Sequence, residues 1–225
     1  PCADDKVIDA CSLFGMMDTT GKRFSGKGVI KAIANMHVRG NGLGGGFAIY
    51  GLYPEYADHY AFHIMYLSQE GKSEVEAFLK QRFRNLAAEE VPTQPTAAIV
   101  NPPLVWRYFL EVDPQQCDGQ SQDDYVVDRV MEINTRIEDS FVFSSGKDMA
   151  VFKGVGYPED IAEYFCLEQY EGYLWTAHGR FPTNTPGWWG GAHPFNILDW
   201  TVVHNGEISS YGINQRYLEG FGYYC

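Results

Sequence analysis

The sequence has no long hydrophobic run, and this excludes a membrane-spanning helix. In its 225 residues no apolar stretch approaches the roughly 18 residues that such a helix needs. Basic residues are also scarce, since 17 Lys and Arg stand against 29 Asp and Glu, for a formal net charge of -12. This charge disfavours binding to a nucleic-acid backbone, so a small molecule or another protein is the expected partner.

Cysteines are few and dispersed, with no CxxC pair, so we expect neither a zinc site nor a disulfide framework. The five cysteines are Cys2, Cys11, Cys117, Cys166 and Cys225. The sequence also lacks a glycine-rich dinucleotide fingerprint and a cysteine cluster, so no cofactor is expected in this chain. Residues 1–10 have neither the basic flank nor the apolar core of a signal peptide, which predicts a cytoplasmic protein.

What the sequence does contain is enough apolar and aromatic side chain for a sizeable core, 45% and 15% of residues respectively. Hydrophobic periodicity and turn residues predict an α+β fold. The predicted strands are 10–17, 47–52, 60–68, 97–100, 104–112, 141–144, 149–154, 173–177 and 201–203. The predicted helices are 26–38 with Ser25 as its N-cap, 72–86, 123–136 and 158–169. No closing helix or strand pair is predicted after residue 203, so we expect the domain to be cut short at residue 225.

The middle of the chain follows a different pattern from its two ends. Between residues 59 and 144 the predicted order is strand, helix, strand, strand, helix, strand, which is typical of ferredoxin-like domains. We interpret 59–144 as a subdomain inserted into a main domain formed by 11–58 and 145–225.

Three groups of residues point to a chemistry. The first is Cys11-Ser12-Leu13-Phe14-Gly15, and the second is Met36-His37-Val38-Arg39-Gly40-Asn41. The third comprises Ala177-His178-Gly179-Arg180-Phe181-Pro182-Thr183-Asn184-Thr185, Ala192-His193-Pro194-Phe195 and His204-Asn205-Gly206-Glu207-Ile208. Their order and spacing resemble the class II glutamine amidotransferase domain, an N-terminal nucleophile (Ntn) hydrolase, and are most similar to the amidotransferase domain of glutamate synthase. The resemblance implies a four-layer αββα sandwich.

Hydrolysis of a primary amide needs a nucleophile, a base, donors for the oxyanion and a cation for the substrate carboxylate. A cysteine at the start of a chain supplies the first two, because its α-amine has a pKa of about 7.7–8.0 and accepts the thiol proton. Cys11 matches the family's nucleophile, whereas taken alone it would be read as a buried strand cysteine. This role requires cleavage of the Ala10–Cys11 bond, so residues 1–10 are the predicted propeptide.

The resemblance also assigns the substrate contacts. Asn205 and Gly206 match the oxyanion hole, although Asn-Gly is also a common hairpin turn. Arg180 matches the arginine that binds the substrate α-carboxylate, and its alternative role is a surface salt bridge. Thr183 and Asn184 would line the same pocket.

The remaining polar residues of these groups carry less definite roles. Arg39 matches the arginine at the end of the first helix, close to the nucleophile, and it would otherwise be a helix C-terminal charge. His178 and His193 are expected to be pocket or core histidines rather than metal ligands. No residue of this sequence is assigned to the substrate α-amine.

These residues predict a glutaminase that releases ammonia from glutamine and passes it to a synthase partner, with glutamate synthesis as the expected use. FMN and iron–sulfur clusters would then belong to the partner subunit. The alternative is a non-catalytic regulatory or structural subunit whose N-terminal extension blocks the Cys11 amine. Amide transfer to a sugar phosphate or a nucleotide precursor uses the same site and ranks last.

Overall fold

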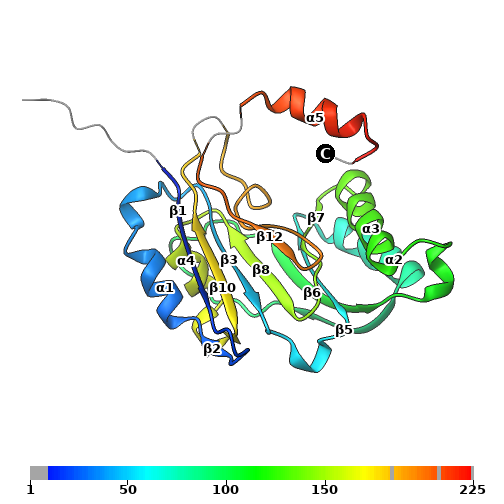
Figure 1. Ribbon diagram of the computed structural model, residues 1–225, viewed down its shortest axis with the longest axis horizontal. Coiled ribbons are helices and arrows are strands. Elements are labelled where there is room, and N and C mark those ends of the chain that lie inside the picture. Colours follow the sequence, from blue (N-terminus) through cyan, green and yellow to red (C-terminus); the bar gives the residue numbers. More distant parts are fainter. Residues whose placement is uncertain (1–9, 183–184, 207–208, 224–225) are drawn as a thin grey trace, which may run out of the picture.

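The computed structural model describes residues 10–182, 185–206 and 209–223. Its elements confirm the predicted mixed α+β class. They include two four-stranded antiparallel sheets, which we call the first and second sheets (Figure 1).

The first sheet carries the elements that the motifs occupy. Its strands lie in the order β1-β10-β3-β8, and their bounds are Ser12–Met17 for β1, Leu174–Gly179 for β10, Gly45–Tyr50 for β3 and Met149–Gly154 for β8. The register sets Ser12 opposite Gly179, Gly179 opposite Gly45, and Gly45 opposite Gly154. The starts of β1 and β3 and the ends of β10 and β8 therefore lie side by side at one end of the sheet, although they are far apart in the sequence.

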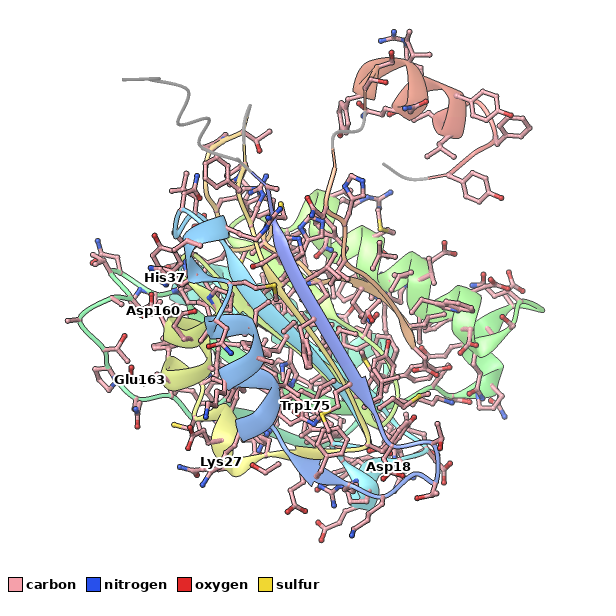
Figure 2. All side chains as sticks on the ribbon, turned by 60° about the vertical axis from the view of Figure 1, so that its left-hand side comes forward. Asp18, Lys27, His37, Asp160, Glu163 and Trp175 are labelled. Carbon is pink, nitrogen blue, oxygen red and sulfur yellow. The ribbon has the colours of Figure 1, made fainter. Side chains whose placement is uncertain are left out.

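Helices α1 (Lys27–Ala34) and α4 (Pro158–Tyr164) cover one face of the first sheet. Trp175 of β10 lies under the start of α1, where a Cβ on Gly26 would come within 2.5 Å of the Trp175 ring (Figure 2). The N-cap is Gly26 rather than the predicted Ser25, because Ser25 belongs to a short strand pair of β2 (Phe24–Ser25) with β9 (Glu171–Gly172).

Both helices of this face are shorter than predicted. Each is followed by a separate 3-10 turn, His37–Arg39 after α1 and Leu167–Gln169 after α4. Cys166, which adopts a left-handed conformation with φ of 55°, separates α4 from its turn. A non-glycine residue in this region ends regular α-helix, which explains why the continuous predicted helix is wrong there.

The opposite face of the first sheet is covered by the segment 185–204, which includes a hairpin of β11 (Phe195–Ile197) and β12 (Trp200–Val202). The Tyr50 hydroxyl donates to the carbonyl of Asp199 at 3.0 Å and lies 2.8 Å from the Thr201 hydroxyl. This face is therefore joined to the segment by polar contacts as well as by packing.

The second sheet has the strand order β5-β6-β4-β7, with bounds of Arg84–Glu90, Leu104–Glu111, Tyr60–Tyr66 and Ser140–Ser144. Helices α2 (Gln69–Arg82) and α3 (Gln122–Arg136) lie on its outer side and share a hydrophobic core with it (Figure 1). Its other side contributes Ala61, Phe109 and Phe143 to the core of the first sheet. A buried hydrogen bond of 2.7 Å between the Tyr53 hydroxyl and His63 Nε2 lies where the two units meet.

Three sequence predictions are wrong in this half and in the tail. The predicted helix 72–86 ends at Arg82, and β5 follows it because Arg84–Glu90 pairs with β6. Residues 97–100 form no strand, and only 97 and 98 lie in a turn. A helix, α5 (Tyr211–Glu219), lies in the tail where none was expected (Figure 1). None of its residues is buried.

In the described residues, helices cover one face of the first sheet and a hairpin with its flanking loops covers the other. The described part of the chain thus provides no second four-stranded sheet on that other face. The four-layer αββα sandwich and the ferredoxin-like insertion remain predictions beyond the α+β class.

Candidate active site

Cys11 lies at the edge of the first sheet, immediately before β1. Because Ser12 pairs with Gly179, the residues that follow β10 are its neighbours. The backbone N–H of Phe181 donates a hydrogen bond to Cys11 Sγ over 3.3 Å. The structure therefore joins the first and third motifs, which are separated by 170 positions in the sequence.

Arg180 is held in the same place by its backbone and by its side chain. Its N–H donates to the Gly44 carbonyl at 2.8 Å. Its guanidinium donates to Thr185 Oγ1 at 2.5 Å and to the Pro186 carbonyl at 3.5 Å. The positively charged Arg180 is thus adjacent in sequence to Phe181, whose N–H contacts Cys11. Its planar guanidinium is bound by residues 185 and 186 of the following loop.

Asn205 and Gly206 are exposed and come just after β12. The residue before them, His204, has its carbonyl oxygen 2.9 Å from Nε2 of His178. His178 is opposite Leu13, two residues beyond Cys11, so this bond ties the Asn-Gly pair to the strands that carry the predicted nucleophile.

The other predicted site residues are not brought into this group. Thr183 and Asn184 lie outside the described residues. Arg39 is half-buried in the turn after α1, and among described residues it makes no hydrogen bond or ion pair with another predicted site residue. Its neighbour His37 binds Glu159 and stacks on Tyr157 at 3.8 Å, which joins the ends of α1 and α4.

Basic side chains line the face of the first sheet beside this site. Burial, with a smaller effect of the Arg180 charge, lowers the pKa of Lys153 to about 7. Burial also lowers the pKa of His178 to about 4 and that of His193 to about 3, and the two imidazole rings are 4.4 Å apart. Near neutral pH both histidines are therefore uncharged.

Two participants were missed by sequence reasoning. The Phe181 N–H is a backbone group that no residue type could reveal. Lys153 is almost fully buried, and its Nζ donates to the carbonyls of Gly190 and Pro194. One sequence signal was available, because a lysine within an otherwise apolar strand must find partners when buried.

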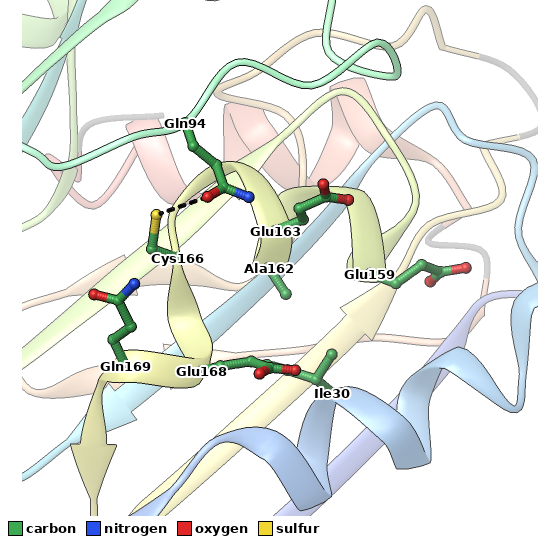
Figure 3. A pocket seen from close by; sticks show the side chains of 8 residues that line it. All are labelled: Ile30, Gln94, Glu159, Ala162, Glu163, Cys166, Glu168 and Gln169. Atoms are coloured by element: carbon green, nitrogen blue, oxygen red, sulfur yellow. Dashed lines mark hydrogen bonds between the residues drawn. The ribbon is translucent and has the colours of Figure 1, made fainter.

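A separate cavity of about 470 Å³ lies between α1, α4 and the loop at Gln94 (Figure 3). Three of its lining residues are the carboxylates Glu159, Glu163 and Glu168, and Cys166 Sγ contacts Gln94 Oε1 at 3.9 Å. None of the predicted site residues lines it. Its carboxylates repel the α-carboxylate of an amino acid, and the described residues that line it include no lysine or arginine to bind that group.

Within the described ranges no group of three or more His, Cys, Asp or Glu side chains is arranged to hold a metal ion. In the same residues no helix is both long and apolar enough to cross a membrane.

Comparison with known proteins adds to this geometry. The sequence model of the family described as class II glutamine amidotransferases matches residues 50–220. An uncharacterized protein of Archaeoglobus fulgidus is 64% identical over 225 residues, which is 98% of this chain and 60% of that protein. A glutamine amidotransferase-like protein of Rhizobium meliloti, GlxB, is 31% identical over 78 residues, covering 34% of this chain and 26% of GlxB.

The fold and the site define an α+β protein in which a cysteine, an arginine and an Asn-Gly pair lie at one edge of an antiparallel sheet. Since the family match covers more than half of its residues, the chain belongs to the class II glutamine amidotransferases. The match assigns no role to any single residue, so the roles of Cys11, Arg39, Arg180, Asn205 and Gly206 all stay predictions. Cys11 and Arg39 also precede the matched range. The chain spans about 60% of the length of the Archaeoglobus relative.

Proposed function

We propose that this chain is the glutaminase part of a glutamate synthase-type enzyme, with Cys11 as the nucleophile. The observation that carries the proposal is the 3.3 Å contact between Cys11 Sγ and the Phe181 N–H, with Arg180 adjacent. In this proposal the α-carboxylate of glutamine binds Arg180, and its side-chain amide lies against the Cys11 thiolate.

The proposed reaction follows from these positions. After cleavage of the Ala10–Cys11 bond, the freed α-amine takes the thiol proton, and the thiolate attacks the side-chain carbonyl of glutamine. The carbonyl π electrons move to oxygen, where the Asn205 amide and the Gly206 N–H stabilise the negative charge. Ammonia then leaves with the proton returned by the amine, and water hydrolyses the thioester to glutamate.

Ammonia has to be consumed elsewhere, so we propose a synthase partner that aminates 2-oxoglutarate. In this proposal FMN and iron–sulfur clusters belong to the partner, and Thr183, Asn184 and Arg39 complete the glutamine pocket. Residues 1–10 act as a propeptide, and the protein works in the cytoplasm.

We also propose that the chain has the fold and the domain boundaries that its motifs predict. Residues 11–58 and 145–225 would contribute to a four-layer αββα domain, and 59–144 would be a ferredoxin-like insertion. The insertion is supported by the strand order β5-β6-β4-β7 with all neighbours antiparallel, because the split βαβ arrangement places its first and third strands together in the centre of the sheet.

The second candidate function is a non-catalytic subunit. It is favoured by the ten residues that precede Cys11, because an intact Ala10–Cys11 bond leaves no α-amine to act as the base. In that state the fold would bind a partner or sense glutamine.

Intact-mass measurement and N-terminal sequencing of the purified chain, followed by a glutaminase assay, separate the two candidates. A terminus at Cys11 with release of ammonia from glutamine supports the catalytic proposal. An unbroken chain without turnover contradicts it and favours the regulatory role.

A further inference from the structure

The segment from Gly190 to Gly206 ends in the predicted oxyanion donors and is attached to the first sheet through its backbone. Lys153 Nζ donates to the carbonyl oxygens of Gly190 at 2.8 Å and Pro194 at 3.2 Å. His178 Nε2 makes the third bond, 2.9 Å to the carbonyl oxygen of His204. All three acceptors are main-chain atoms, so these bonds fix the path of the segment whatever its side chains.

The two donors lie in one row across the sheet. Lys153 of β8 and His178 of β10 are both opposite Gly46 of β3, so they project from the same face on either side of a residue without a side chain. The His193 carbonyl takes the space above Gly46, where a Cβ would be only 2.3 Å from that oxygen. The face of the sheet therefore offers the segment two hydrogen-bond donors, Lys153 and His178, with the space above Gly46 between them.

From this geometry, and resting on the proposed function, we propose that His178 and Lys153 are positioning residues that fix the Asn205 and Gly206 oxyanion donors next to Cys11. His178 has the more direct effect, because its acceptor immediately precedes Asn205. Lys153 holds the same segment farther from the site.

The chemistry of each donor suits this role. A carbonyl oxygen only accepts, so His178 must carry its proton on Nε2, and its buried Nδ1 has no hydrogen-bond partner in the described residues. Its low pKa keeps this neutral form populated at any pH where the enzyme would work. Lys153 can donate two hydrogen bonds as an ammonium or as a neutral amine, so its contacts survive titration.

The expected effect on catalysis is large because oxyanion stabilisation depends on distance. Donors act when they lie about 2.7–3.1 Å from the developing oxyanion, and losing one typically lowers kcat about 10²–10³-fold. Substrate binding should change much less, because the Arg180 backbone is held independently by Gly44.

The test uses the full chain processed to a Cys11 terminus and compares His178→Leu, His178→Gln, Lys153→Met and Thr176→Val. Leucine removes the donor, whereas the amide of glutamine can replace Nε2–H. Thr176 is the matched control, since it lies two residues earlier on the same face of β10 and its buried hydroxyl has no hydrogen-bond partner within the described ranges. Thermal unfolding and alkylation of Cys11 by iodoacetamide report whether each variant is folded with its thiol accessible.

We expect His178→Leu to lower kcat for glutamine about 10²-fold or more with a KM within a few-fold of the wild type. His178→Gln should restore much of the lost kcat, and Lys153→Met should lower kcat by a smaller factor than His178→Leu does. Thr176→Val should leave both kcat and KM unchanged. A rise in KM with unchanged kcat in His178→Leu would place His178 in substrate binding and overturn the proposal.

A second readout does not need turnover. The γ-semialdehyde of glutamate forms a reversible adduct in which the Cys11 sulfur bonds to the aldehyde carbon and the carbonyl oxygen becomes an oxyanion. His178→Leu should weaken this inhibitor about 10²-fold while the affinity for glutamate, which forms no such adduct, stays the same. Equal loss for both ligands, or for neither, contradicts the proposal.

These outcomes distinguish a failure of the positioning role from a failure of the proposed function. If the wild type hydrolyses glutamine and binds the aldehyde tightly but His178→Leu behaves like it, only the positioning role is wrong. If the processed wild type does neither, the proposed function is wrong and the inference fails with it.

Discussion

The segment 190–206 packs so closely against Gly46 of β3 that no side chain fits there. A Cβ at this position would come within 2.3 Å of the His193 carbonyl oxygen, 2.7 Å of Lys153 Cβ and 2.8 Å of the Phe152 carbonyl oxygen. Two of these atoms belong to the backbone and cannot move away like the end of a flexible side chain. Gly46→Ala must therefore displace either β8 or the segment itself.

Overpacking of this kind costs about 1–3 kcal/mol. For a chain of this size, each 1 kcal/mol shifts the melting temperature by about 2–4 °C, so we expect Gly46→Ala to lower Tm by several degrees. Because the displaced segment leads to Asn205 and Gly206, kcat for glutamine should fall as well.

Gly28 provides a control, because alanine at this position should raise the stability of the protein instead of lowering it. It lies within α1, is exposed, and a Cβ there would meet no atom within 4 Å. Gly28→Ala should stabilise the protein by about 0.5–1 kcal/mol, because alanine favours the helix and restricts the unfolded chain. Thermal and urea unfolding of both variants check the pair. A Gly46→Ala protein as stable and active as Gly28→Ala would refute the close packing described for this face.

Three further outcomes are expected. Cys11→Ala should abolish release of ammonia from glutamine without lowering Tm, and retained turnover would remove Cys11 as the nucleophile. Arg180→Ala should raise KM for glutamine about 10-fold or more with a smaller change in kcat, and Arg180→Lys should recover only part of the loss because lysine lacks the planar fork; an unchanged KM would exclude the carboxylate role. Burial lowers the pKa of His63 to about 3. Below a pH of about 6.5 the unfolded chain therefore binds more protons than the folded one, so the free energy of unfolding decreases as the pH is lowered. His63→Gln should reduce the loss of unfolding free energy between pH 8 and pH 5 by about 2 kcal/mol in urea titrations, whereas an equal loss in both proteins would contradict a buried neutral imidazole.

Where the sequence mispredicted an element, the cause was tertiary pairing. Residues 84–90, with leucine, alanine and glutamate, favour a helix by propensity, yet they form β5 because the edge of β6 offers hydrogen bonds. Residues 97–100 are apolar enough for a strand, but Ile99 is buried near Gly156 in irregular chain after the turn at 97–98, and Val100 is exposed.

The tail shows the converse case. Helix α5 has no buried residue, so in the described chain no core contact accompanies it. The glycines and tyrosines of the tail are not helix signals. The exposed aromatic side chains of the helix, among them Tyr211 and Tyr217, made the tail resemble irregular chain.

The sequence by itself determined the α+β class, the strands of the first sheet and the family, because these depend on hydrophobic alternation and on ordered motifs. It also singled out Cys11 and Arg180, whose chemistry is specific. Only the tertiary structure decided that Phe181 donates its N–H to Cys11 Sγ and that Lys153 and His178 bind backbone carbonyls of the segment leading to Asn205. The physical reason is that such contacts arise from strand register and from main-chain atoms, which every residue type possesses and which no sequence pattern distinguishes.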